Sequence, residues 1–151
     1  SLDNGRLSVA AMSVGMGRRI LDTAVRYATE RKAFGEPIAN FQLIQAMLAD
    51  SDAELYAAEC MISDACARAD RGEAILRKAA AAKMFASETC GRVVDRVVQI
   101  YGGAGYLAEY AAERFFRDAR ILRIYEGTTQ IMQLQIAKHL LREFEREGAV
   151  W

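Results

Sequence analysis

The sequence predicts an all-α protein, an antiparallel (up-and-down) four-helix bundle. Four long stretches repeat apolar residues at intervals of three, four or seven, which is the spacing of one helix face. Glycine, proline and capping residues separate these stretches. No segment alternates convincingly at a period of two, so we expect no sheet. With 151 residues, 52% of them hydrophobic and 26% charged, the chain has the composition of one globular domain with its own core.

The first two helices are expected at residues 4–31 and 41–69. The turn between them contains Pro37, the only proline of the chain, which cannot continue a helix. Asn40 can cap the second helix by accepting a hydrogen bond from its first turn. Gly72 stands where a glycine commonly ends a helix.

Three further helices are expected at residues 73–101, 111–119 and 129–147. The glycine-rich segment 102–105 ends the first of these, and Thr128 is a suitable N-cap for the last. Because the connections between the four long helices are short, neighbouring helices should run antiparallel.

Apolar spacing also predicts which helix faces point inward. Gly15 and Gly17 interrupt the face of the first helix, and because glycine weakens a helix interior, we expect a close neighbour or a ligand there. The inward residues expected on the first and last helices are Leu7, Ala11, Val14, Leu21, Val25 and Ala28, followed by Ile131, Leu134, Leu141 and Phe144.

Bulk composition argues against several classes of protein. Lys plus Arg and Asp plus Glu both number 20, so no basic surface suggests nucleic-acid binding. No apolar run approaches the ~20 residues of a membrane helix, and residues 1–6 do not resemble a signal peptide. We therefore expect a cytoplasmic protein, with the mitochondrial matrix left open. Three cysteines without paired spacing suggest free thiols, and a single histidine, His139, predicts no metal site.

The strongest candidate for chemistry is Glu126. It precedes a helix-breaking Gly127 and lies just before the N-terminal end of the last helix, where negative charge is favoured. A carboxylate held by such a turn, with apolar residues before it, is a plausible general base. The alternative interpretation is an acidic residue that merely precedes a helix start.

Two other patterns allow a binding interpretation and a structural one. The glycine-rich segment 102–105 follows a helix rather than a strand, so a helix cap is the simpler interpretation than a phosphate loop. Arg114, Arg117, Arg120 and Arg123 recur every three residues, which suits either a salt-bridged surface or an anion site.

Several short motifs occur in one order along nearly the whole chain. They are Asp3 with Arg6, Arg31–Gly35, Phe41–Gln42, Gln99–Tyr106, Glu109 with Arg114 and Asp118, and Tyr125–Gln130. Together they resemble the C-terminal domain of the acyl-CoA dehydrogenase family.

The resemblance implies a flavoenzyme that converts an acyl-CoA thioester to the trans-2-enoyl-CoA. In this family a carboxylate base removes the α-proton, FAD accepts the β-hydrogen as hydride, and an electron-transfer flavoprotein receives the electrons. It also implies assembly as a homotetramer or homodimer.

The resemblance assigns roles to individual residues. Glu126 corresponds to the catalytic base. Substrate contacts are implied for Asp3, Arg6 and Gly127. Contacts to FAD, some of them across a subunit interface, are implied for Arg31, Phe34, Phe41, Gln42, Gln99, Gly102, Gly103, Thr128, Thr129 and Gln130.

Some branches of the family, such as isovaleryl-CoA dehydrogenases, place the base on the first helix, at the position of Gly5 in this chain. Glycine there, with Glu126 intact, implies the common arrangement. Family enzymes also carry an N-terminal helical domain and a middle β-domain, so we expect residues 1–151 to be one C-terminal bundle that folds alone but turns over no substrate.

Three alternatives remain open from the sequence. An acyl-CoA oxidase or a flavin monooxygenase relative would share the bundle, and an oligomerisation module would have no chemistry. An α-proton base at position 126 disfavours the monooxygenase. The chain length and branching of the acyl group are expected to depend on pocket residues, many of them in the N-terminal helical and middle β-domains.

Overall fold

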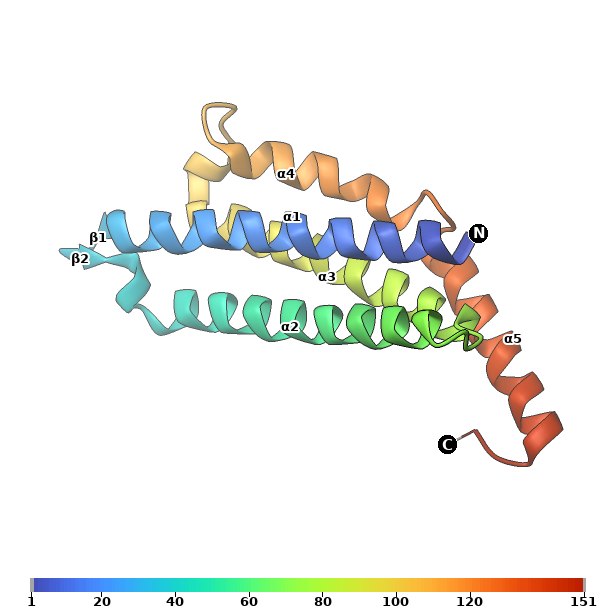
Figure 1. Ribbon diagram of the computed structural model, residues 1–151. Helices are drawn as coiled ribbons and strands as arrows, with labels where there is room; N and C mark the ends of the chain where they lie inside the picture. The colour runs from blue at the N-terminus through green and yellow to red at the C-terminus, as the bar shows by residue number, and fades with distance from the viewer. Residues whose placement is uncertain (1, 151) are drawn as a thin grey trace.

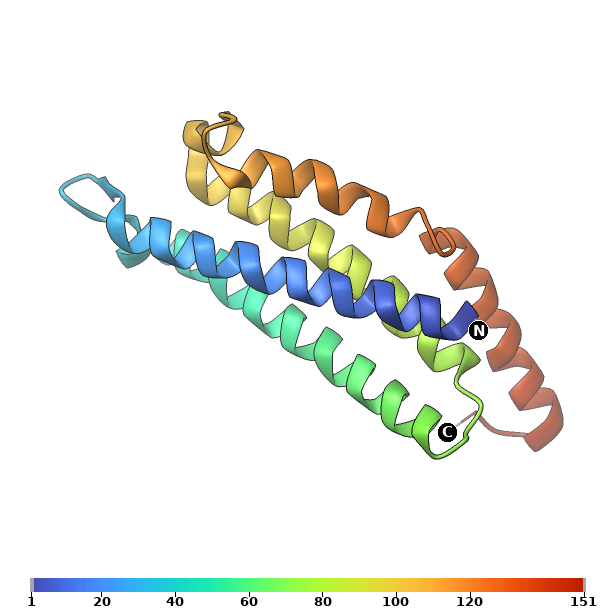
Figure 2. The ribbon, with the colours of Figure 1, turned by 45° about the horizontal axis from the view of Figure 1, so that its top comes forward.

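The computed structural model describes residues 2–150 and confirms the predicted all-α bundle. Helices α1 (Leu2–Glu30), α2 (Gln42–Asp70) and α3 (Leu76–Tyr101) pack along one another, each antiparallel to the one before (Figure 1). Helix α4 (Ala111–Ala119) packs along α3 and contacts α1. Helix α5 (Thr129–Glu147) contacts α3 and projects away from the other helices at the end where α1 begins (Figure 2).

The turn between α1 and α2 corrects two expectations. Strands β1 (Lys32–Ala33) and β2 (Glu36–Pro37) pair there as a short antiparallel hairpin. The prediction that the chain contains no sheet was therefore wrong at this turn. A 3-10 turn, η1 (Ile38–Asn40), follows. Asn40 donates its side-chain N–H to Glu36 Oε2 at 2.8 Å and does not cap α2, whose N-cap is Phe41.

Most helix ends follow the predicted capping chemistry. Gly72 has a φ of 76° directly after the C-cap of α2, and Gly102 ends α3 with a φ of 59°. Thr128 caps α5, because its side-chain oxygen accepts a hydrogen bond from the Ile131 N–H at 3.3 Å. Two further 3-10 segments, η2 (Gly102–Tyr106) and η3 (Arg120–Arg123), flank α4.

Small side chains on α3 let its neighbours approach closely, which makes it the central helix. The fully buried stripe of α3 contains Ala79, Ala82, Ala86, Cys90, Val93 and Val97. On α1, a Cβ at Gly17 would lie 2.5 Å from Leu55 Cδ2, so the expected close neighbour is confirmed there. At Gly15 no described atom lies within 4 Å of that position, so a close neighbour is absent there.

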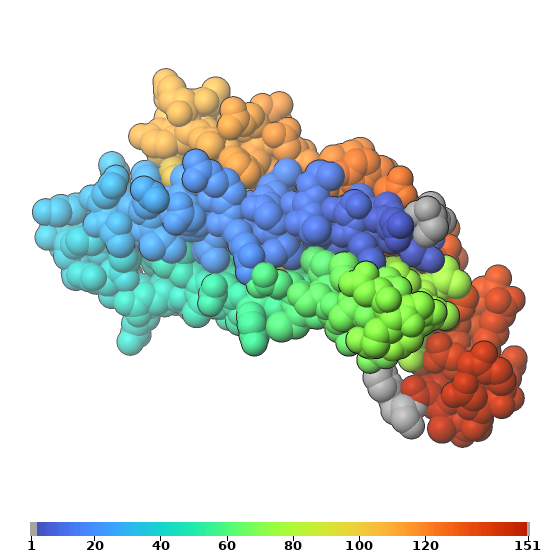
Figure 3. All heavy atoms as spheres, viewed as in Figure 1, coloured from blue at the N-terminus to red at the C-terminus, as the bar shows by residue number. Residues whose placement is uncertain are grey.

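The inward residues expected on α1 and α5 are partly wrong. Ala11 and Val25 are exposed, and Ile20 and Ala24 are buried in their place. All four residues expected inward on α5 are exposed, at 45–67% of their surface, whereas Met132 is fully buried. The space-filling view shows why, since much of α5 extends beyond the other helices (Figure 3). No helix within residues 2–150 is long and apolar enough to cross a membrane.

An ion-pair cluster joins α2 to α3 in the middle of the bundle. Glu54 accepts hydrogen bonds from Arg92 Nε at 2.8 Å and Arg96 Nη2 at 2.9 Å. Burial acts to raise the pKa of Glu54, but the hydrogen bonds and charges of Arg96 and Arg92 outweigh it, so this pKa lies below its usual value. The carboxylate is therefore more readily ionised in the folded chain than in the unfolded chain.

Replacing Glu54 by Gln should lower the free energy of unfolding at pH 7 by about 1 kcal/mol. A depressed folded-state pKa contributes stability above the unfolded-state value of about 4.3, and this contribution disappears as the pH falls through the folded-state pKa. Urea unfolding of parent and variant should therefore differ at neutral pH and converge in acid. Glu145→Gln on exposed α5 is the control, and an equal loss in both variants would contradict the assignment.

Candidate functional site

Glu126 lies in a tight turn between η3 and α5 whose backbone conformation is unfavourable for most residue types. Its φ is 55° and that of Gly127 is 97°, so two successive residues adopt the left-handed region. A Cβ at Gly127 would also collide with Met132 Cε. The glutamate side chain is exposed, so a ligand can reach its carboxylate.

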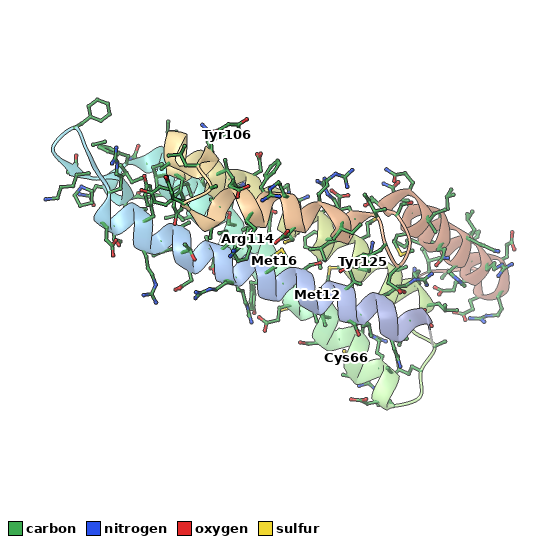
Figure 4. All side chains as sticks on the ribbon, turned by 90° about the horizontal axis from the view of Figure 1, so that it is seen from above. Met12, Met16, Cys66, Tyr106, Arg114 and Tyr125 are labelled. Carbon is green, nitrogen blue, oxygen red and sulfur yellow. The ribbon has the colours of Figure 1, made fainter. Side chains whose placement is uncertain are left out.

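The carboxylate of Glu126 lies against the first turns of α1. A Cβ added at Gly5 would be 2.7 Å from Glu126 Oε2 and 3.1 Å from its Cδ. Glycine at position 5 therefore leaves the space that the carboxylate occupies. Just before Glu126, the Tyr125 hydroxyl is 3.5 Å from Met12 Sδ, so Tyr125 lies beside α1 as well (Figure 4).

A buried lysine of α3 holds the turn from below. Lys83 has no exposed surface, and its Nζ donates to the Gly127 carbonyl oxygen at 2.6 Å. The pKa of Lys83 lies below its usual value, mainly because the side chain is buried and also because of the nearby charge of Arg6. The negative charges of Glu88 and Glu126 act in the opposite direction but do not outweigh the burial. Among the described side chains, no carboxylate forms an ion pair with Lys83.

Arg6 brings a second buried cation to this corner. Only 2% of the surface of Arg6 is exposed. Its Nη1 donates a hydrogen bond to Asp3 Oδ1 at 3.2 Å, and its Nε has no hydrogen-bond partner among the described residues. Glu126 is thus an accessible carboxylate in a turn that buried Lys83 holds, with buried Arg6 next to Gly5 on α1. An accessible carboxylate in a fixed position can serve as a proton acceptor.

The start of α5 is tied to α3 through Glu88. Its Oε1 accepts a hydrogen bond from Thr129 Oγ1 at 2.6 Å, and its Oε2 accepts one from Arg123 Nη1 at 3.3 Å. A pocket of about 240 Å³ opens beside these groups. It is lined by Glu88, Arg120, Arg123, Ile124, Thr128, Thr129 and Gln130.

The remaining candidate residues lie at the opposite end of the bundle. Phe34 is at the tip of the hairpin with 97% of its surface exposed, and its ring is edge-on to Phe41 at a centroid distance of 6.0 Å. Arg31 and Gln42 flank the hairpin and are exposed. Tyr27 of α1 stacks on Tyr101 of α3 at 3.9 Å, which brings the end of α3 beside the end of α1. The candidates at that end of α3 are Gln99, Gly102 and Gly103.

The candidates therefore form two groups that one chain does not bring together. Figure 1 shows the hairpin at one end and the α4–α5 connection, beside the start of α1, at the other. Helix α1 spans this distance with 29 residues, which is roughly 40 Å at 1.5 Å per residue. Asp3, Arg6 and residues 126–130 share one end, and residues 31–42 and 99–103 share the other.

Comparison with known proteins identifies the family. The model of the acyl-CoA dehydrogenase C-terminal domain matches residues 1–141. The chain belongs to the acyl-CoA dehydrogenase family. The family domain accounts for the bundle and contains every candidate residue named above.

Individual family members agree with this match. The caffeyl-CoA reductase–Etf complex subunit CarC of Acetobacterium woodii is 44% identical over 143 residues, which are 95% of this chain and 38% of that protein. The human mitochondrial short-chain specific acyl-CoA dehydrogenase is 43% identical, over 95% of this chain and 35% of that protein. The structure of butyryl-CoA dehydrogenase from Megasphaera elsdenii superimposes with a TM-score of 0.91 at 40% identity, covering 93% and 37% of the two chains. The chain thus spans little more than a third of these relatives.

Sequence analysis did not find Lys83 or Glu88. A signal for Lys83 was available, because it lies within the apolar register of α3, next to Ala82 and one turn before Ala86 and Ser87. A charged residue on an inward helix face needs a partner, and the partner is a backbone oxygen 44 residues away. Spacing alone could not indicate that oxygen.

Replacing Gly127 by Ala should destabilise the isolated chain more than the same change at Gly35. Both glycines have positive φ, at 97° and 88°, and each substitution loses about 1–2 kcal/mol for that reason. Only position 127 has a side chain in the way, which adds about 1–3 kcal/mol. Urea unfolding of both variants measures the difference, and equal losses would show that the turn relaxes freely.

Proposed function

We propose that this chain is the C-terminal bundle of an FAD-dependent acyl-CoA dehydrogenase in which Glu126 removes the α-proton of the substrate. The observation that carries the proposal is the Glu126 carboxylate lying over Gly5 in front of two buried cations. The family membership supports the reaction class. The bundle would work as one part of a longer protein that supplies the N-terminal helical and middle β-domains.

The proposed chemistry divides one C–C bond oxidation between a base and a cofactor. The thioester carbonyl acidifies the adjacent C–H, so a carboxylate can accept the α-proton. Bound FAD supplies the acceptor for the β-hydrogen, which leaves as hydride. The product is the trans-2-enoyl-CoA, and Glu126 carries one proton until solvent removes it. Asp3, Arg6 and Gly127 are proposed to contact the acyl-CoA.

The residues present fit FAD as two partial sites. At the Glu126 end, α5 presents its capped N-terminus, with Thr128, Thr129 and Gln130 lining a pocket that contains two arginines. At the hairpin end, Arg31 and the exposed Phe34 offer a cation and an aromatic ring, and no described atom fills the side-chain space above Gly102 and Gly103. Both kinds of surface suit a dinucleotide, whose phosphates need cations or backbone N–H groups.

Because roughly 40 Å separates the two groups, the proposal requires association of chains. The hairpin end of one chain would complete a cofactor site on another, in a homodimer or homotetramer. The exposed apolar residues of α5 are available for such contacts. An electron-transfer flavoprotein is the proposed acceptor, because one relative is named as a subunit of an Etf complex.

Three other functions remain as alternatives. An acyl-CoA oxidase would keep the same base and pass electrons to oxygen. A flavin monooxygenase relative or a non-catalytic module would have no use for an α-proton base, so the exposed carboxylate and its buried cations disfavour both.

Replacing Glu126 by Gln in the full-length protein should slow flavin bleaching by acyl-CoA by at least about 100-fold, because the proton acceptor is lost. FAD content should not change. The measurement is anaerobic stopped-flow absorbance with straight-chain acyl-CoAs from butyryl to palmitoyl, and Glu145→Gln is the control. A variant that bleaches at the parental rate would remove Glu126 from the mechanism.

Moving the base across the contact with Gly5 should retain part of the activity. In the double variant Gly5→Glu with Glu126→Gly, the new side chain projects into the space that the original carboxylate filled. We expect bleaching at least about tenfold faster than in the Glu126→Gly single variant, since a carboxylate again lies near the substrate. Equal rates in the double and single variants would show that the two positions do not serve one site.

A further inference from the structure

We propose that Lys83 is the positioning residue for the base Glu126, holding the Glu126–Gly127 turn through the Gly127 carbonyl and keeping positive charge behind the carboxylate. This inference rests on the proposed function of Glu126. It assigns a role to a fully buried residue of α3 that bonds to the backbone of the turn.

The hydrogen bond is the first observation behind this proposal. Lys83 Nζ donates to the Gly127 oxygen at 2.6 Å, across 44 residues of sequence and from a different helix. Glu126 has a φ of 55°, and a residue other than glycine keeps such a conformation only when the surroundings impose it. Lys83 fixes the Gly127 carbonyl by this hydrogen bond. On the α1 side, the missing side chain of Gly5 lets the Glu126 carboxylate approach the helix closely.

The burial of Lys83 is the second observation. Lys83 has no exposed surface, so its ammonium group loses the free energy of hydration. Among the described side chains no carboxylate pairs with it, so no ion pair offsets this loss. A methionine would fill similar space at less cost. A helix that only needed packing at this position would therefore be better served by an apolar residue.

Charged side chains from every element at this corner surround Lys83. Arg6 and Asp3 come from α1, Glu88 and Lys83 itself from α3, Arg123 from η3, and Glu126 from the turn. Asp3 pairs with Arg6, and Glu88 binds Arg123 and Thr129. Among the described side chains, neither Lys83 nor Glu126 has an ion-pair partner at this corner.

The decisive variant is Lys83→Met in the full-length holoenzyme, assayed by anaerobic flavin bleaching with the acyl-CoA that bleaches the parent fastest. We expect the rate at neutral pH to fall about 10- to 100-fold, because the base is both displaced and harder to ionise. The acid limb of the rate profile should move about one unit to higher pH. The acyl-CoA concentration at half-maximal rate should stay within about twofold, because Lys83 does not contact the substrate.

Lys138→Met on the exposed surface of α5 is the matched control and should leave the rate and the pH profile unchanged. Lys83→Gln is the second variant if the methionine variant does not retain flavin. Its amide keeps a hydrogen-bond donor at the buried position, one bond shorter than lysine, and removes the charge, so its acid limb should move in the same direction.

Each outcome decides the role of Lys83. A parental rate and an unshifted acid limb in a flavin-loaded variant would overturn the proposal. Loss of flavin in both variants would also overturn it, because Lys83 would then serve folding. Glu126→Gln, measured alongside, separates the two proposals. If it bleaches normally, the function of Glu126 fails and the role of Lys83 fails with it, whereas a slow Glu126→Gln with a normal Lys83→Met removes Lys83 alone.

Discussion

The left-handed turn at Glu126 and Gly127 is the constraint on which this end of the molecule depends. It reverses the chain between η3 and α5 and points the Glu126 side chain back over α1. Each neighbouring element carries one residue that makes this possible. Helix α1 has no side chain at Gly5, α3 supplies the donor Lys83, and α5 begins at a threonine cap. The Glu126 carboxylate is therefore held by three helices although it lies in a loop.

The central helix connects the core to the site. Between Ala79 and Val97, α3 buries small residues that let α1 and α2 approach closely. This packing fixes the position of Lys83 on α3 relative to the turn. A change in the core of α3 would therefore displace the site as well as weaken the fold.

Most helix bounds and caps were predictable because they depend on local chemistry, although Asn40 does not cap α2 as expected. Residues 111–119 and 129–147 were predicted as found, and the glycine stops at Gly72 and Gly102 have the expected positive φ. The inward face of α5 was not predictable. Its apolar residues follow helical spacing, but spacing does not say what covers a face, and within this chain little covers this one. The contact between Gly5 and Glu126 joins residues 121 positions apart, so apolar spacing could not reveal it, although the resemblance had named both as alternative positions of the base.

The strained backbone of Glu126 and the buried ammonium of Lys83 occur together because one hydrogen bond helps to stabilise both. A positive φ at glutamate costs about 1–2 kcal/mol, and a buried ammonium without a paired carboxylate also costs stability. The Lys83–Gly127 hydrogen bond offsets part of both, because one donor satisfies the buried ammonium and fixes the strained turn. The remaining cost is borne by the apolar packing of the rest of α3. Three local rules are broken around this turn, at Gly5, Lys83 and Glu126. Such a concentration is expected where a sequence is constrained by chemistry as well as by folding.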